Sequence, residues 1–111
     1  MEKRSVLRVP FAADAEVSLE ISPSATASAR VRELSLYGCY LDTPAPYDPQ
    51  TQILVKIFTH GKYFEAKATV VHVREASGMG LEFREVKPDF RVVLQDWLLA
   101  AMRKNTVNEQ R

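Results

Sequence analysis

The stretch ADAEVSLEI at residues 13–21 decides the fold class of this chain. Apolar residues occupy every second position, and Asp14, Glu16, Ser18 and Glu20 fill the places between them. Because the side chains of a β-strand alternate between two faces, this period of two predicts a half-buried strand that begins near Phe11 and has one wet face.

Further strands follow along the chain. We expect them at residues 26–36, 39–41, 52–59, 62–73 and 79–83, with turn residues between them. The turns include Ser22-Pro23-Ser24, three prolines within residues 43–50, and His60-Gly61. Six short strands at steady spacing predict an all-β fold, a six-stranded antiparallel β-barrel.

The pattern changes at Pro88, which is well placed to begin a helix over residues 88–104. Apolar residues then recur at intervals of three and four, as expected of a C-terminal helix that packs on the barrel: Phe90, Val93, Leu94, Trp97 and Ala101. Arg103 and Lys104 suit the last turn, and Asn105 is an acceptable C-cap.

A second apolar stripe on this helix consists of Val92, Leu99 and Met102. One stripe satisfies packing on the barrel, so a second indicates a surface for a partner or for a homodimer through the C-terminal helix. The alternative is one wide buried face followed by a frayed end.

Composition limits the classes of function. The 111 residues suffice for one domain, and 15 Lys+Arg against 14 Asp+Glu give a net charge of +1, without the basic excess typical of a DNA- or RNA-binding domain. A single cysteine, Cys39, excludes internal disulfides and a cysteine zinc site. The sequence has neither an apolar run long enough for membrane insertion nor a secretion signal, which predicts a cytoplasmic protein.

Catalytic motifs are missing from the sequence. Neither His60 nor His72 belongs to a metal-ligand spacing, and there is no nucleophile elbow, Walker loop or dinucleotide fingerprint. Cys39 follows Gly38 in a short strand and is interpreted as a small core residue. We therefore expect no enzymatic activity, no metal and no cofactor.

The first ten residues are interpreted as a flexible basic arm that contains Lys3, Arg4 and Arg8. Guanidinium groups are planar forks that suit phosphate oxygens and the O6/N7 edge of guanine, and two of them on an arm can converge on one ligand. A solvated basic tail is the alternative interpretation.

The stretch ELSLYG at residues 33–38 places an acid, a hydroxyl and a glycine where a strand ends. The Glu33 carboxylate can accept hydrogen bonds from guanine N–H groups. The Ser35 hydroxyl and a backbone N–H beside Gly38 can donate to phosphate. By itself, the stretch is better explained as an ordinary strand-end turn.

Together these segments resemble the PilZ domain family. That family is marked by Arg-x-x-x-Arg, often after another basic residue, and further on by Asp/Asn-x-Ser-x-x-Gly. The matching positions here are Lys3, Arg4 and Arg8, followed by Glu33, Ser35 and Gly38. VVHVR at 70–74 and GMGLEF at 78–83 look like the closing strands of the family, so the resemblance covers residues 3–99.

The resemblance implies a single PilZ-like domain over residues 1–111: an arm at 1–10, a six-stranded split barrel at 11–87 and a helix at 88–104. It also implies a receptor for the bacterial second messenger cyclic di-GMP. Arg4 and Arg8 would contact guanine and phosphate, Ser35 would hold phosphate or guanine, and Gly38 would allow close backbone approach. Motility, adhesion and polysaccharide export, as in biofilms, are equally compatible outputs.

Glu33 departs from the family pattern, because its side chain is one methylene longer than Asp or Asn. A misplaced polar contact costs about 1–3 kcal/mol, or about ten- to a hundred-fold in affinity. Two hypotheses remain: a receptor whose ordered arm signals to a downstream protein partner, and a degenerate PilZ-like domain that binds no nucleotide and acts as a protein interaction module. A third, a barrel for single-stranded nucleic acid, conflicts with the balanced charge.

Overall fold

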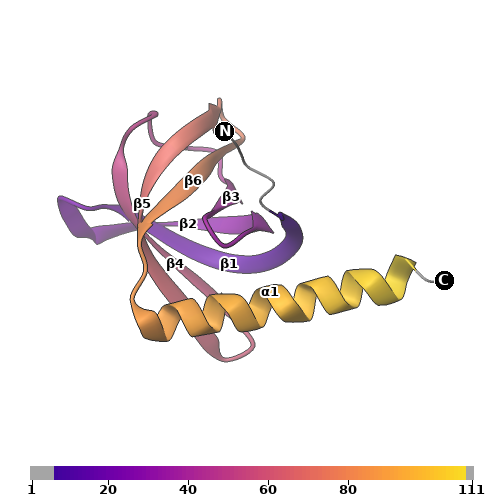
Figure 1. Cartoon of the computed structure of the whole chain (residues 1–111). Helices are drawn as coiled ribbons and strands as arrows, with labels where there is room; N and C mark the ends of the chain where they lie inside the picture. The colour runs from indigo at the N-terminus through magenta and orange to yellow at the C-terminus, as the bar shows by residue number, and fades with distance from the viewer. Residues whose placement is uncertain (1–6, 110–111) are drawn as a thin grey trace, which may run out of the picture.

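A computed structural model of the chain describes residues 7–109, with side chains up to Lys104. Its strands are β1 (Val9–Leu19), β2 (Ser22–Leu34), β3 (Gly38–Asp42), β4 (Gln52–Thr59), β5 (Lys62–Arg74) and β6 (Gly78–Glu85), followed by helix α1 (Pro88–Glu109). The strands close into an antiparallel barrel in the order β1-β2-β3-β6-β5-β4, and α1 runs alongside it (Figure 1). The predicted all-β barrel with a C-terminal helix is confirmed.

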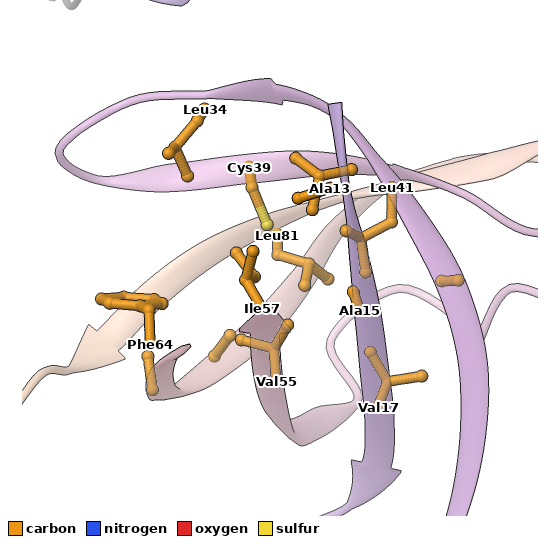
Figure 2. Close-up of a cluster of buried hydrophobic side chains, with 14 of the residues drawn as sticks. Ala13, Ala15, Val17, Leu34, Cys39, Leu41, Val55, Ile57, Phe64 and Leu81 are labelled. Carbon is orange, nitrogen blue, oxygen red and sulfur yellow. The ribbon is translucent and has the colours of Figure 1, made fainter. Parts of the chain in front are cut away.

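The core fills the inside of the barrel, as the alternation in the sequence requires. Ala15 and Val17 of β1 pair with Ile57 and Val55 of β4, and all four are buried. Figure 2 shows these side chains in one cluster with Phe64 of β5 and residues of β2, β3 and β6. Every strand thus contributes one apolar face to the same core.

The first hairpin differs from the prediction at both ends. β1 begins at Val9 rather than Phe11, because Val9 pairs with Leu34 and is only 3% exposed. The turn falls at residues 20–21, since Leu19 already pairs with Ser22. Ile21 is therefore exposed at the tip, and the predicted Ser22-Pro23-Ser24 turn is instead the start of β2, a stretch whose residues up to Ser28 are all exposed.

Helix α1 continues to Glu109, so the predicted end at Lys104 and the C-cap at Asn105 are wrong. No glycine or proline lies between residues 105 and 109. Extending a helix that has already formed adds one hydrogen bond per residue, and nothing in this stretch interrupts the chain of bonds.

The predicted packing stripe of α1 is confirmed. Leu94 and Trp97 are buried, and α1 packs against β1 and β5. Phe64 of β5 lies at the junction, with its ring centroid 5.1 Å from Phe83 and 6.5 Å from Trp97. On the other stripe, Val92 and Leu99 remain more than half exposed, so the helix does not have the single wide buried face of the alternative.

We predict that Phe64→Ala lowers the free energy of unfolding by about 3–5 kcal/mol, because it opens a cavity between the barrel and α1. Val92→Ala, on the exposed stripe, should change it by less than about 0.5 kcal/mol. Urea denaturation followed by far-ultraviolet circular dichroism measures both. Equal effects of the two substitutions would contradict the assignment of Phe64 as the packing centre.

Candidate functional site

A hollow of about 610 Å³ lies on the outer surface of the barrel, over β2, β3, β6 and β5. Its lining consists of Arg8, Glu33, Leu34, Ser35, Tyr37, Gly38, Cys39, Tyr40, Val71, His72, Gly80, Leu81 and Glu82. Four of the six predicted site residues, Arg8, Glu33, Ser35 and Gly38, thus line one hollow. Lys3 and Arg4 lie outside the described residues.

Strand pairing places Arg8 at this hollow. Val9 pairs with Leu34, and Pro10 pairs with Glu33, so the start of β1 runs beside the end of β2. Arg8 immediately precedes this paired segment, and its neighbour Val9 is anchored in the core. Arg8 of the first motif therefore meets the residues of the second motif because of a β-ladder.

Two irregularities in the ladders flank the hollow. The β2–β3 register shifts between Val31 and Glu33, and the β5–β6 register shifts between Val70 and His72. A bulge adds a residue to one strand and re-aims the side chains beside it. Here the bulges accompany the outward placement of Glu33 and His72, which both line the hollow.

Ser35 builds the turn between β2 and β3. It is 6% exposed; its Oγ accepts a hydrogen bond from the Tyr37 amide (3.2 Å) and donates one to the Gly38 carbonyl (3.3 Å). The Ser35 amide donates to the same carbonyl at 2.9 Å. The hydroxyl proton is thus engaged within the turn, and Ser35 fixes the shape of this corner of the hollow.

Gly38 lets β3 approach β6. A Cβ atom at this position would lie 2.0 Å from the Leu81 carbonyl oxygen, which is part of the β6 backbone. The space beside Gly38 is therefore filled by the backbone of the neighbouring strand of the barrel. The same corner is closed by the Phe83 amide, which donates to the Tyr37 carbonyl at 2.8 Å.

The described lining combines one permanent cation, Arg8, with two carboxylates, Glu33 and Glu82. A nearby guanidinium, Arg32, is bound elsewhere: its Nε lies 2.9 Å from Asp42, and this hydrogen bond and charge raise the pKa of Arg32. Arginine suits phosphate, and carboxylates accept from N–H donors. The lining therefore fits a ligand that carries both an anionic group and a donor edge.

Cys39 lies at the floor of the hollow and is buried, as predicted for a small core residue. Burial raises the pKa of its thiol to about 12, so the thiol stays protonated and unreactive at neutral pH. Among the described residues, no cluster of three or more His, Cys, Asp or Glu forms a candidate metal site. No helix in the described part of the chain combines the length and apolar character that crossing a membrane requires.

The lining residues that were not predicted from the sequence include Tyr40, His72 and Glu82. Each lies on a strand within an otherwise ordinary pattern of alternation. The sequence signal that could have pointed to them is Gly78-x-Gly80. Two glycines on one face of a strand mark a place where a neighbouring side chain lies over the backbone.

The fold is a small β-barrel with a polar hollow on its surface, and the comparisons with known proteins name its class. The PilZ domain family profile matches residues 2–100, and the chain belongs to this family. No curated protein sequence matches the chain.

Solved structures show the same fold. The PilZ domain with c-di-GMP of YcgR from Escherichia coli has a TM-score of 0.77 at 15% identity, covering 98% of both chains. The inhibitor of motility MotI/DgrA from Bacillus subtilis has a TM-score of 0.76 at 17% identity, covering all of this chain and 55% of the other. The PilZ domain of CeSA from a cellulose-synthesizing bacterium reaches 0.62 at 16% identity, covering 79% of this chain and 90% of the other.

We predict that Gly38→Ala lowers the free energy of unfolding by about 3 kcal/mol or more, because the new methyl group would overlap the Leu81 carbonyl. Gly80→Ala is the matched control. Its Cβ would be no closer than 3.4 Å to any neighbour, and the expected change is under about 1 kcal/mol. Thermal unfolding followed by circular dichroism compares them; a Gly38→Ala protein as stable as Gly80→Ala would refute the close approach of β3 to β6.

Proposed function

We propose that this protein is a cyclic di-GMP receptor without enzymatic activity and without a cofactor, and that the ligand binds in the hollow over β2, β3, β6 and β5. The observation that carries the proposal is the pairing of β1 with β2, which sets Arg8 beside Glu33, Ser35 and Gly38. Membership of the PilZ family and the c-di-GMP complex of the YcgR domain support the choice of ligand.

The chemistry of the lining matches the two parts of this ligand. The guanidinium of Arg8 binds a phosphate or the O6/N7 edge of guanine, and Arg4 and Lys3 add the further cations. The Glu33 carboxylate accepts from guanine N1–H and N2–H₂. Ser35 and Gly38 set the corner against which the ligand lies.

The proposed signalling step is the ordering of the N-terminal arm by the ligand. The ligand binds Arg4 and Arg8 and fixes the N-terminal residues over the barrel, and this new surface engages a downstream protein partner in the cytoplasm. Regulation of motility is the output that the Bacillus subtilis inhibitor of motility favours. The balanced charge of the chain, +1, argues against DNA or RNA as the partner.

The second candidate is an interaction module that binds no nucleotide. The exposed stripe of α1 favours it, because Val92 is 56% and Leu99 is 55% exposed on a helix whose other side packs on the barrel. The occupant we propose for this stripe is a second copy of the chain, in which case α1 forms a homodimer.

We predict that cyclic di-GMP binds the wild-type protein with micromolar affinity or tighter, and that Arg8→Ala weakens binding at least about thirty-fold, through loss of a charged hydrogen bond. Isothermal titration calorimetry measures this. Arg30→Ala is the matched control, because Arg30 is an exposed arginine of β2 paired with Asp14 at 2.6 Å. Equal loss in the two variants, or none in Arg8→Ala, would exclude the site.

The Glu33 position gives a second comparison in the same titration. Glu33→Asp restores the shorter carboxylate, and Glu33→Gln removes one acceptor oxygen. If Glu33 receives the guanine edge, Glu33→Asp keeps or tightens binding, and Glu33→Gln weakens it about ten-fold. Identical affinities for all three would remove Glu33 from the binding residues.

For the homodimer, Leu99→Glu places a charge on the exposed stripe. We expect sedimentation equilibrium to show dimers of the wild type and folded monomers of the variant, because Leu99 does not pack in the core. A monomeric wild type at concentrations of about 100 μM would exclude self-association through α1.

A further inference from the structure

The exposed stripe of α1 runs along the side of the helix that faces away from the barrel. Val92 and Leu99 are seven residues apart, which is close to two full turns, so they lie in line along the helix. They are 56% and 55% exposed, whereas Leu94 and Trp97, on the side toward the barrel, are buried. The stripe is therefore accessible to another helix along its length.

The C-terminal turns of α1 extend past the barrel (Figure 1). Ala101 is half-buried, and the side chains that the structure describes after it, at residues 102–104, are exposed. Helical turns without packing partners are only marginally stable in water. A second helix along the exposed stripe would support these turns, as the barrel supports the first half of α1.

Two opposite charges flank the exposed stripe. Arg91 precedes Val92, and Asp96 follows it by four residues, so the two charged side chains stand on opposite sides of the stripe. Both are exposed, and neither forms an ion pair with any residue in the part of the chain that the structure describes. When such a stripe is the seam of a coiled coil, these flanking positions form ion pairs between the two helices.

A parallel, in-register pairing of two α1 helices satisfies both the apolar and the charged groups. Val92 and Leu99 then meet their own counterparts across a twofold axis, and Arg91 of each copy faces Asp96 of the other. Gln95 lies between them and also meets its counterpart. A polar pair in the seam lowers affinity but fixes the register. The exposed stripe is thus complementary to itself.

Antiparallel pairings satisfy only one of the two groups. A register that packs Val92 on Leu99 of the second copy sets the two Asp96 carboxylates beside each other, and like charges repel. A register that brings Asp96 to Arg103 of the second copy leaves Val92 opposite residue 109, at the end of the helix. The parallel arrangement is therefore favoured.

We propose that α1 pairs with α1 of a second copy as a short parallel coiled coil, with Val92 and Leu99 in the seam and two Arg91–Asp96 ion pairs between the copies. The proposal rests on the homodimer of the second candidate function and adds its orientation, register and charged contacts. Because the seam spans about two heptads and its ion pairs are exposed, association is weak. The chain is then monomeric at the low concentrations used for circular dichroism.

Charge reversal, followed by sedimentation equilibrium at about 100 μM, tests the ion pairs. We expect Arg91→Asp and Asp96→Arg each to weaken dimerisation at least about five-fold, because two attractive contacts become repulsive. The double variant, and an equimolar mixture of the two single variants, should come within about three-fold of the wild-type affinity, because both restore opposite charges. Arg103→Asp is the matched control: it reverses another exposed arginine of α1 and should leave dimerisation unchanged.

Disulfide cross-linking tests the register. Val92→Cys and Leu99→Cys should both form covalent dimers under mild oxidation, because a parallel seam holds equivalent residues within reach of a disulfide. In the two antiparallel registers, the Val92 positions of the two copies lie about 10 Å or more apart along the helix. The wild type is the control, since its one cysteine, Cys39, is buried.

Far-ultraviolet circular dichroism checks that each variant keeps the fold, and a variant that loses it is replaced by the neutral Arg91→Gln or Asp96→Asn. A wild-type dimer that Arg91→Asp leaves intact, or that Val92→Cys does not cross-link, would overturn the parallel pairing while the homodimer itself stands. A wild type that stays monomeric would overturn both. Binding of cyclic di-GMP, measured separately by calorimetry, is unaffected by either outcome.

Discussion

The pairing of Val9 with Leu34 is the contact on which both the core and the site depend. Val9 is buried, and its place in the ladder fixes the register of the first residues of β1, ahead of the register shift between Pro10 and Ala13. A slip of one residue in this segment would turn its side chains to the other face. The same pairing sets Arg8 beside the β2–β3 turn, so the burial of one valine side chain also positions the cation of the site.

The second constraint is the close approach of the β3 and β6 backbones. It shapes the site and also allows the barrel to close. Gly38 lies against the Leu81 carbonyl, and Gly78 lies against both the Leu41 carbonyl and the Tyr40 ring. A side chain at either position would separate β3 from β6. Gly38 also lines the hollow, and the absence of a side chain at Gly78 lets the Tyr40 ring lie close to β6.

The strands and the packing stripe of α1 could be predicted from the positions of apolar residues. These residues alternate in the strands and recur every three or four positions in the helix, and the buried side chains follow the same patterns. The ends of β1 and α1 could not, since Val9 is held by a partner far along the chain and the last turns of α1 depend on the continuity of the helix. Arg8, Glu33, Ser35 and Gly38 were found from motif spacing. Tyr40, His72 and Glu82 come together only through the order β3-β6-β5, which local sequence does not specify.

The structure also changes the interpretation of the ELSLYG motif. Ser35 and Gly38 form bonds and contacts within the barrel, so their first effect is on the shape of the turn. Glu33 and Arg8, by contrast, carry charges into the hollow. The longer side chain of Glu33 therefore changes only how far its carboxylate extends into the hollow. The turn, the glycine approach and the strand register that define the hollow do not depend on whether that carboxylate carries one methylene or two.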